Sequence, residues 1–263
     1  MSPIASSLAD RSAVITGGGR GIGAAIAAAL AERGVRVLVS ARSADQIEAV
    51  ADELREGGAE AHAVPCDVSD PAEVRSLAEQ ARELLGPVDI LVNNAGFAPS
   101  APLAAIDLEG WHQVFAVNVT GTLLCSQAFA PGMADRGWGR VVNVASIAGR
   151  VGAPYIAAYA ATKHAVVGLT RALGAEMAKS GVTVNAVCPG YVDTPLTEAS
   201  IARIVDKTGI SEDDVLQHMR ESSPQGRLMD PSEVAYLVVC LCEDDARGIN
   251  AQAIVVDGGG VQA

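Results

Sequence analysis

A short apolar strand at residues 11–16 leads directly into a glycine-rich turn, Gly17-Gly-Gly-Arg-Gly-Ile-Gly23, which opens a helix over residues 24–33. Glycine permits a tight turn and lets a ligand approach the backbone closely, and the free N–H groups at a helix start attract an anion. This order of strand, turn and helix is typical of dinucleotide-binding folds. By itself, the cluster would also fit a plain connection between a strand and a helix.

The rest of the chain continues the same alternation. Strands are predicted at residues 11–16, 35–40, 60–66, 88–92, 140–145, 182–188 and 253–256. Helices are predicted at residues 24–33, 45–57, 71–85, 107–134, 159–180, 197–207, 212–221 and 231–243. With no internal repeat or linker, this pattern predicts an α/β fold: a doubly wound Rossmann fold with a seven-stranded parallel sheet, in a single domain over residues 1–263.

Composition and charge narrow the class of protein. The formal net charge of −12 over 263 residues argues against nucleic acid or an anionic membrane as a partner. No apolar run approaches the roughly 20 residues that span a bilayer, and the first residues lack the basic and apolar regions of a signal peptide. We expect a soluble, cytoplasmic protein.

Cysteine and histidine usage predicts neither disulfides nor a metal site. The five cysteines, at positions 66, 125, 188, 240 and 242, are odd in number and lack a framework spacing, so we expect buried, reduced thiols. The four histidines, at positions 62, 112, 164 and 218, are scattered without metal-ligand spacing.

Tyr159 and Lys163 form a candidate acid–base pair. Four residues are one helical turn, so both side chains project from one face, and a nearby cation should lower the pKa of the phenol. An exposed tyrosine beside a solvated lysine would have the same spacing. Ser146 ends a predicted strand, and Asn118 lies in the middle of a predicted helix, where asparagine is disfavoured unless it has a specific role.

The end of the second strand indicates which cofactor would bind. A free ribose 2′-hydroxyl usually meets a carboxylate at this point, but the chain reads Ser40-Ala41-Arg42 and has no carboxylate before Asp45. Arg42, helped by Arg20, would suit a 2′-phosphate, which favours NADP over NAD. Either arginine could also be an ordinary solvated side chain.

Taken together and in order, these motifs resemble the short-chain dehydrogenase/reductase family, over residues 11–260. The matching pieces are Thr16-Gly17-x3-Gly21-Ile22-Gly23, Asp67-Val68, Asn93-Asn94-Ala95-Gly96, Asn118, Ser146, Tyr159-x3-Lys163, Pro189-Gly190 and Thr194. Ser146 precedes Tyr159 by 13 residues, which is the usual interval in that family.

The resemblance implies a role for each matching position. Cofactor-binding positions would be Gly17, Arg20, Gly21, Ile22 and Gly23 at the phosphates, Asp67 and Val68 at the adenine, Asn94 at the adenosine ribose, and Val192 and Thr194 at the nicotinamide, with Pro189 and Gly190 in the same loop. Arg42, from the end of the second strand, joins them as the candidate for the ribose phosphate. Lys163 would bind the nicotinamide ribose and lower the pKa of Tyr159. Ser146 and Tyr159 would hold the substrate carbonyl, and Asn118 would anchor a water in the proton relay.

The resembling subgroups are the 3-oxoacyl reductases, polyketide ketoreductases and 3-hydroxyacid dehydrogenases. They imply NADP(H)-dependent hydride transfer between the nicotinamide and a ketone or secondary alcohol, with a 3-oxoacyl or polyketide-type carbonyl, free or as an acyl thioester. An NAD-dependent secondary alcohol or 3-hydroxyacid dehydrogenase remains open, as does a non-catalytic NADP-binding regulator. Arg136, Arg140 and Lys179 are candidates to meet a carrier protein.

Two expectations concern the less regular parts of the chain. Residues 196–229, bounded by Pro195 and Pro231, are expected to form a substrate lid whose apolar helix faces close on the ligand, or else a surface helical hairpin. The helices at residues 107–134 and 159–180 are apolar on more than one face. In the resembling family such helices pair between subunits, so we expect a homotetramer.

Overall fold

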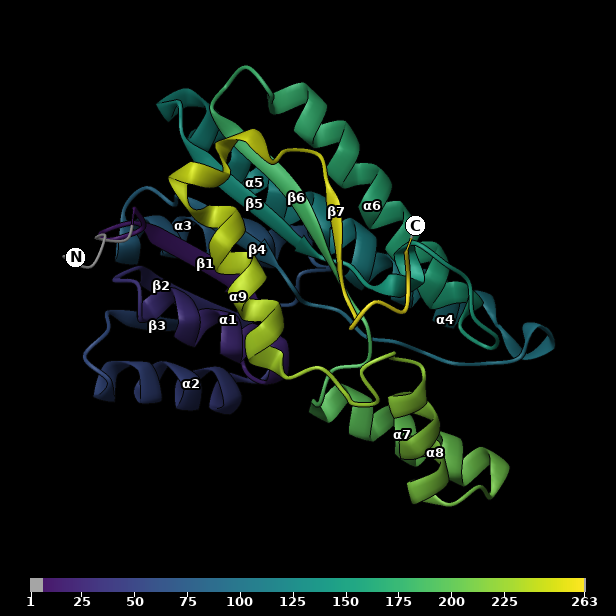
Figure 1. The fold of residues 1–263 in the computed structure, drawn as a ribbon. Coiled ribbons are helices and arrows are strands. Elements are labelled where there is room, and N and C mark those ends of the chain that lie inside the picture. The colour runs from purple at the N-terminus through teal and green to yellow at the C-terminus, as the bar shows by residue number, and fades with distance from the viewer. Residues whose placement is uncertain (1–6, 263) are drawn as a thin grey trace.

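The computed structural model describes residues 7–262, and its centre is one parallel sheet of seven strands (Figure 1). The strands are β1 (Ser12–Thr16), β2 (Arg36–Ala41), β3 (Ala61–Pro65), β4 (Ile90–Asn93), β5 (Gly139–Val144), β6 (Val182–Pro189) and β7 (Ala253–Val256). Their order in the sheet is β3-β2-β1-β4-β5-β6-β7. The order reverses between β1 and β4, where such sheets open a ligand crevice at the carboxyl ends of the strands. The predicted fold is confirmed.

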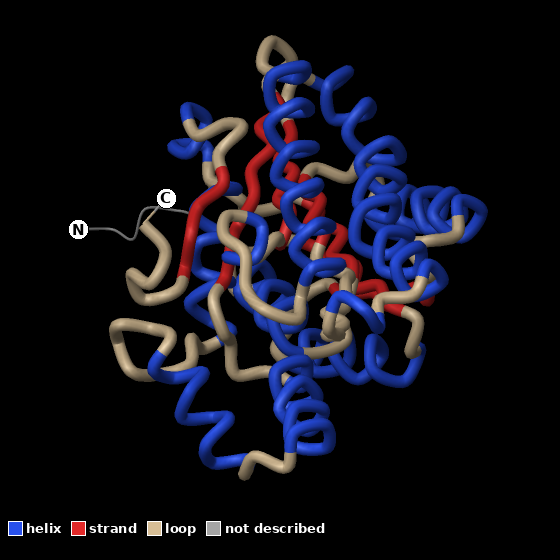
Figure 2. The backbone as a smooth tube through the Cα atoms, turned by 90° about the vertical axis from the view of Figure 1, so that its right-hand side faces the viewer, coloured by secondary structure: helices blue, strands red, loops and turns tan. Residues whose placement is uncertain are grey.

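Helices cover both faces of the sheet (Figures 1 and 2). One face packs against α1 (Gly21–Ala31), α2 (Ala44–Glu56) and α9 (Pro231–Cys242). The other packs against α3 (Pro71–Leu85), α5 (Gly121–Arg136) and α6 (Ala157–Met177). The central strands β1, β4, β5 and β6 are wholly buried between these layers, which explains their continuous Val, Ile and Leu content, whereas the edge strands β3 and β7 are partly exposed.

Capping residues fix two of these helices where the sequence predicts them. The Asp70 carboxylate accepts the N–H groups of Ala72 and Glu73, with Pro71 at the first helical position. Asp230 and Glu233 form a capping box at the start of α9. Both patterns satisfy N–H groups that a helix start leaves free, which is why these starts can be read from sequence.

The helix expected at residues 107–134 is interrupted. It consists of α4 (Leu108–Phe115), a π-helical turn η2 (Ala116–Thr120) and α5. Asn118 lies in the π turn, and its side chain bonds outside the helix, to Phe97. The wider turn accommodates this contact, and such turns are frequent at functional sites. The expected helical run is present over Leu108–Arg136, and the π turn within it is the feature that the sequence does not predict.

The segment 196–229 projects from the body of the fold as two helices, α7 (Pro195–Thr208) and α8 (Glu212–Glu221) (Figure 1). Their apolar faces pack on each other: the buried side chains of this cluster are Ile201, Val215 and Met219, and the partly buried ones are Ile204, Val205, Leu216 and Leu228. Each helix buries its apolar face against the other, which is the arrangement of the helical-hairpin alternative. Closure of the segment over a substrate stays a prediction. Leu196, at the start of α7, does line the crevice.

The remaining sequence expectations have mixed outcomes. All five cysteines are free thiols, as expected, but Cys240 is only partly buried. In residues 7–262 no three His, Cys, Asp or Glu side chains gather as metal ligands would. One helical run, Leu108–Arg136, is long and apolar enough by composition to cross a membrane. Its residues Cys125, Phe129 and Met133 pack in the core, so this is weak evidence for a span.

The short helices are 3₁₀ turns that connect the main elements. They are η1 (Leu103–Ala105), η3 (Ile147–Gly149) and η4 (Asp244–Gly248). In the sequence, η1 is the next element after β4, and η3 comes after β5, with Ser146 as the residue that caps its start. η3 therefore lies beside the carboxyl end of β5, whereas η1 is on an exposed part of the chain.

Candidate active site

The glycine-rich turn after β1 has no room for larger residues. Gly17 and Gly21 have left-handed backbones, with φ of 64° and 55°. A Cβ atom on Gly23 would lie 2.2 Å from the carbonyl oxygen of Gly17, and one on Gly17 would lie 2.8 Å from Nδ2 of Asn94. α1 begins at Gly21 with no side-chain cap and no acidic residue in its first turn. Its N-terminal N–H groups are thus left for an anionic ligand.

Asn94 ties this turn to the end of β4. Its Nδ2 donates to the carbonyl oxygens of Thr16 (3.0 Å) and Gly17 (2.9 Å), while the Thr16 hydroxyl accepts from the backbone N–H groups of Asn94 and Ala95, each at 3.1 Å. The expected place of Asn94 was near the adenosine ribose. The structure places it in the cavity wall, and also gives it the task of fixing the turn across the switch point.

A cavity of about 520 Å³ opens above this turn. The predicted cofactor residues that line it are Gly17, Arg20, Gly21, Ile22, Arg42, Asp67, Val68, Asn94 and Thr194. Burial raises the pKa of Asp67, but the hydrogen bonds from Ser69 and the charge of Arg42 outweigh it and lower that pKa overall. Asp67 is therefore an ionised acceptor beside the Arg42 cation.

A smaller cavity of about 100 Å³ adjoins the first. The predicted residues that line it are Ile22, Asn94, Ser146, Tyr159, Lys163, Pro189, Gly190, Val192 and Thr194. Both cavities share walls formed by Ile22, Asn94, Gly96, Phe97, Thr194 and Leu196. The two spaces are thus parts of one crevice, with the expected acid–base residues at its inner end.

The loop after β6 closes this end of the crevice. Gly190 donates its N–H to the Val256 carbonyl (2.9 Å) and lies so close to Asp257 that a Cβ would come within 2.8 Å of that residue's Cβ. Thr194 caps α7 and lies against Gly21, where an added Cβ would be 3.3 Å from Thr194 Cγ2. The end of β6 is therefore in contact with the glycine-rich turn.

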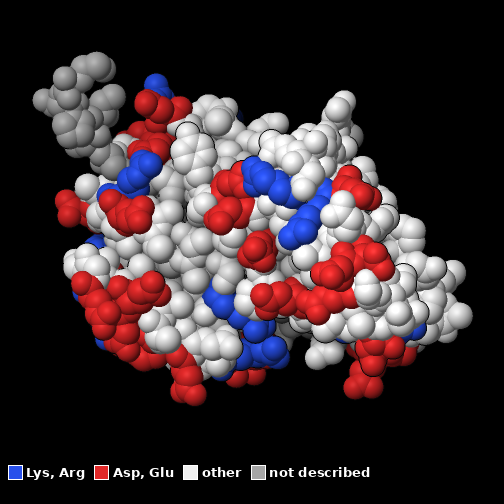
Figure 3. Space-filling view, turned by 60° about the horizontal axis from the view of Figure 1, so that its bottom comes forward, with Lys and Arg blue, Asp and Glu red and all other residues white. Residues whose placement is uncertain are grey.

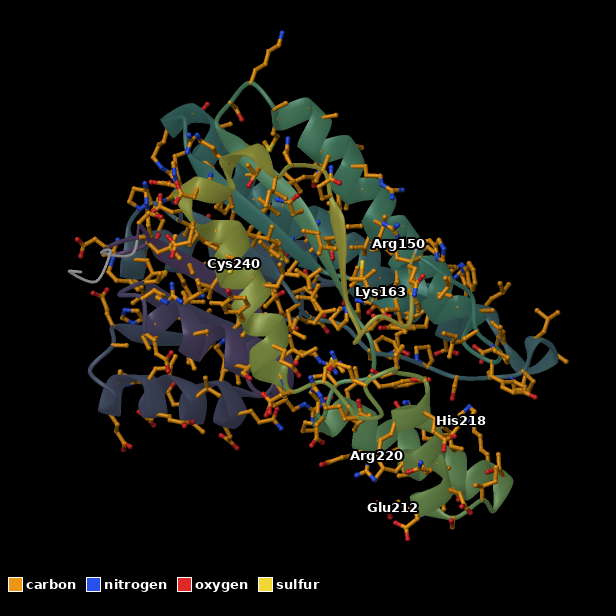
Figure 4. All side chains as sticks on the ribbon, viewed as in Figure 1. Arg150, Lys163, Glu212, His218, Arg220 and Cys240 are labelled. Carbon is orange, nitrogen blue, oxygen red and sulfur yellow. The ribbon has the colours of Figure 1, made fainter. Side chains whose placement is uncertain are left out.

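Lys163 of α6 lies in the interior of the fold (Figure 4) and lines the smaller cavity together with Tyr159. Its Nζ donates to the Val144 carbonyl oxygen at 2.8 Å and lies 5.7 Å from the centroid of the Tyr159 ring. The side chain is buried, and this burial lowers the pKa of Lys163 to about 8. A lysine in this state is charged at neutral pH but loses its proton readily.

The pKa of Tyr159 differs from the sequence expectation. Burial raises it, and a hydrogen bond with the Ser146 hydroxyl opposes the rise only in part. The expectation that Lys163 lowers the pKa of Tyr159 below its ordinary value differs from this structure, where desolvation of the phenolate is the largest cause and raises that pKa. Tyr159 is therefore protonated at neutral pH, as a proton donor must be.

Asn118 lies behind the crevice wall rather than in it. Its side chain is almost wholly buried, and it exchanges two hydrogen bonds of 3.0 Å with the backbone of Phe97. Nδ2 also donates to the Thr162 hydroxyl at 3.1 Å. Gly96 separates Asn118 from the cavity, since a Cβ there would lie 3.0 Å from Asn118 Oδ1 and 3.8 Å from Lys163 Nζ.

Sequence reasoning missed three residues of the site. Phe97 lines both cavities, Thr197 lines the smaller one, and Thr162 donates to the Tyr159 carbonyl at 2.7 Å. Phe97 directly follows the Asn-Asn-Ala-Gly motif and Thr162 lies within the Tyr-x3-Lys motif. Their closeness to these motifs in the sequence is the signal that could have placed them in the site.

The crevice fits a nicotinamide dinucleotide. A pyrophosphate can bind at the glycine turn, where only backbone groups would contact it and the start of α1 is uncapped. The Arg42 cation at the end of β2 suits the adenosine part of the cofactor. The larger cavity would hold that part, and the smaller cavity, with Ser146, Tyr159 and Lys163, would hold the nicotinamide end and the substrate. Fold and site together define a dinucleotide-dependent oxidoreductase.

Comparison with known proteins gives the family. Residues 17–260 match the family described as "Enoyl-(Acyl carrier protein) reductase". A Streptomyces coelicolor protein named as a candidate ketoacyl reductase is 41% identical over 249 residues, covering 94% of this chain and 95% of that protein. A D-beta-hydroxybutyrate dehydrogenase of Rhizobium meliloti is 38% identical over 253 residues, covering 95% and 98%.

A solved structure agrees with these relatives. A variant of actinorhodin polyketide ketoreductase with NADPH superimposes with a TM-score of 0.93 at 40% identity, covering 96% of this chain and 98% of that one. The chain belongs to the short-chain dehydrogenase/reductase family and is an oxidoreductase that binds a nicotinamide cofactor.

Proposed function

We propose that this protein reduces a ketone with NADPH, and that its substrate is a 3-oxoacyl or polyketide-type carbonyl, presented as a thioester or as a neutral ketone. The observation that carries the proposal is the smaller cavity, where the Ser146 and Tyr159 hydroxyls meet above the buried Lys163 ammonium. The ketoreductase relatives support the same assignment.

The residues of the site divide the work of carbonyl reduction. When bound, the nicotinamide cofactor supplies the hydride. The Ser146 and Tyr159 hydroxyls orient the carbonyl oxygen, and Tyr159 donates its proton to the alkoxide that develops there. The Lys163 ammonium stabilises the resulting phenolate. Asn118 holds Phe97 by two hydrogen bonds, and Phe97 and Gly96 form the part of the crevice wall in front of Asn118.

Cofactor preference follows from the end of β2. Arg20 and Arg42 line the larger cavity, and both side chains are exposed there, without an aspartate or glutamate directly after β2. A planar cation at that point favours a ribose 2′-phosphate. The similar polyketide ketoreductase, which was solved with NADPH, supports this preference.

The lining of the smaller cavity bears on the substrate. Its apolar residues include Phe97, Val192 and Leu196, and Lys163 supplies its one charged side chain among the described residues. A free 3-hydroxy acid would bring a carboxylate that no arginine there could bind, so the lining favours a neutral carbonyl. An NAD-dependent 3-hydroxyacid dehydrogenase is the second candidate, favoured by the hydroxybutyrate dehydrogenase relative.

The expectation that Arg140 could meet a carrier protein is wrong, because its side chain is buried. Arg140 is only 2% exposed, its guanidinium stacks on Trp138, and it pairs with Asp244 at 3.6 Å. Arg136 and Lys179 are exposed. The surface in Figure 3 carries acidic side chains across much of one face, with basic side chains in fewer groups.

A spectrophotometric screen tests the proposal. Purified protein would be mixed with NADPH or NADH and with 3-oxoacyl thioesters or cyclic ketones, and, in the opposite direction, with 3-hydroxybutyrate and NAD⁺ or NADP⁺. We expect NADPH oxidation with at least one thioester or ketone, absent in Ser146→Ala. Turnover confined to 3-hydroxybutyrate with NAD⁺ would establish the second candidate. Cofactor binding without any turnover would favour a non-catalytic regulator.

A further inference from the structure

The segment 97–101, which follows β4, is hydrogen-bonded to three separate parts of the fold, to side chains of two of them and to the backbone of the third. Its first residue, Phe97, holds the Asn118 amide. Its last, Ala101, donates its N–H to the carbonyl oxygen of Tyr155 at 2.8 Å. Between them, Ala98 and Ser100 accept hydrogen bonds from α7 of the segment 196–229. We call residues 97–101 the crossing segment.

The bonds from α7 come from two basic residues one helical turn apart. Arg203 Nη2 donates to the Ala98 carbonyl oxygen at 3.0 Å and to the Ser200 hydroxyl at 2.9 Å. Lys207 Nζ donates to the Ser100 carbonyl oxygen at 3.1 Å. Neither cation forms an ion pair with a carboxylate of residues 7–262.

The Arg203 side chain is more buried than that of Lys207. Its Nε is buried and has no hydrogen-bond partner among the described residues. An arginine placed only to stabilise the helix would leave such a group in water. Its position is instead set by the two bonds of Nη2, one within α7 and one to the crossing segment.

From Ala98 a continuous chain of bonds leads to the catalytic helix. The neighbouring Phe97 is bonded to Asn118, Asn118 Nδ2 donates to the Thr162 hydroxyl, and that hydroxyl donates to the backbone carbonyl of Tyr159 at 2.7 Å. Asn118 and Thr162 are both almost wholly buried, so these bonds are shielded from water and geometrically constrained.

We propose that Arg203 is a positioning residue, which links the placement of α7 over the crevice to the placement of Asn118 and Tyr159. When α7 is docked, Arg203 fixes Ala98, and with it Phe97, which lines both cavities. When α7 moves away, this bond is lost and the wall behind the substrate loosens. The effect on turnover rests on the proposed function, whereas the mechanical link does not.

The central experiment compares Arg203→Ala with Arg220→Ala. Arg220 is an exposed arginine on α8 of the same projecting segment (Figure 4), so its removal changes the charge equally without touching the crossing segment. For Arg203→Ala we expect kcat to fall roughly 3- to 30-fold, with the dissociation constant of NADPH unchanged. Arg220→Ala should behave as the parent protein. Arg203→Lys, which retains one donor, should be intermediate.

Hydrogen exchange supplies a readout that needs no turnover. In Arg203→Ala the hydrogen-bonded amides of Phe97 and Ala101 should exchange faster than in the parent protein, and in Arg220→Ala they should not. Unchanged exchange in the crossing segment would overturn the link, whatever the activity. A protein that shows the exchange effect but reduces no ketone would contradict the proposed function and leave the link standing.

A double-mutant cycle tests whether the chain of bonds acts as a unit. Thr162→Val removes the hydroxyl between Asn118 and Tyr159 while keeping the side-chain shape. If Arg203 acts through this hydroxyl, the fold-loss in kcat of the double variant should be smaller than the product of the two single losses. Losses that multiply would contradict the proposal. If Arg203→Ala fails to fold, Arg203→Gln, which keeps a neutral donor, takes its place in every comparison.

Discussion

The Lys163 ammonium lies 5.7 Å from the centre of the Tyr159 ring, but its hydrogen bond goes to the Val144 carbonyl oxygen, 2.8 Å away. Lysine and tyrosine therefore share a buried site without a direct bond between their polar atoms. Burial has opposite effects on the two pKa values, lowering that of Lys163 and raising that of Tyr159. Both pKa shifts favour the neutral form of the side chain, the free amine of Lys163 and the phenol of Tyr159.

This burial makes Lys163 costly to the fold at neutral pH. A pKa lowered from 10.5 to about 8 means that the unfolded chain binds more protons than the folded one between these two values. Stability therefore rises with pH across that window, and below pH 8 the charged lysine is destabilising by roughly 3 kcal/mol. We expect Lys163→Met to be inactive, yet more stable than the parent protein at pH 7.

Urea unfolding at pH 7 and pH 10 measures this effect. The stability advantage of Lys163→Met should shrink at pH 10, where the parent lysine is largely neutral in the folded state. The lost bond to Val144 reduces the advantage at both values alike, so the difference between them is the informative quantity. An advantage that stays constant or grows with pH would show that Lys163 is not destabilised by its burial.

Replacing Tyr159 by phenylalanine tests the proton donor. The ring and its packing remain, but the proton and the hydrogen bond with Ser146 are lost. We expect kcat to fall at least about 100-fold, with NADPH binding retained. Steady-state kinetics and fluorescence titration of NADPH measure the two quantities. Near-normal turnover in Tyr159→Phe would assign the proton to another group.

Local sequence determined much of this architecture. The α3 helix has its predicted bounds because Asp70, Pro71 and Gly86 are local signals for a start and a stop. Tyr159 and Lys163 share a cavity because a four-residue spacing places them on one helix face. In both cases the physical cause lies within a few residues along the chain.

The missed features depend on contacts between distant residues. The π turn at Asn118 exists with a bond to Phe97, which is 21 residues away. The raised pKa of Tyr159 reflects desolvation of its hydroxyl in the folded chain, and spacing along the sequence does not report that. The apolar faces of α7 and α8 had two possible partners, the substrate or each other, and amphipathicity alone does not choose between them.

Arg42 should decide the choice between the two nicotinamide cofactors. It lines the larger cavity, close enough to Asp67 to influence its pKa, and it is exposed rather than held in an ion pair in the described residues. We expect Arg42→Ala to weaken NADPH binding roughly 10- to 100-fold, since one charge-assisted contact at a phosphate is lost. NADH binding should be nearly unchanged.

Fluorescence titrations with both cofactors measure this, and Arg82→Ala is a suitable control because Arg82 is an exposed arginine on α3 that lines neither cavity. Equal losses for NADPH and NADH in Arg42→Ala would mean that the arginine does not read the 2′-phosphate.

The last prediction concerns assembly as a homotetramer with two-fold axes. The outer face of α6 carries exposed small residues, including Gly168 and Ala172, and a second helix could pack closely on such a face. All four residues of the edge strand β7 are partly exposed as well. Light scattering at micromolar concentration should give about four times the 26.8 kDa mass of the chain.

Ala172→Arg should reduce that mass, because a long charged side chain would enter the proposed α6 contact. Ala49→Arg, the same change on the exposed face of α2, should leave the mass unchanged. A monomer mass for the parent protein would refute the assembly. If both variants dissociated equally, the added charge and not its position would be responsible. The subunit contact could then not be assigned to α6.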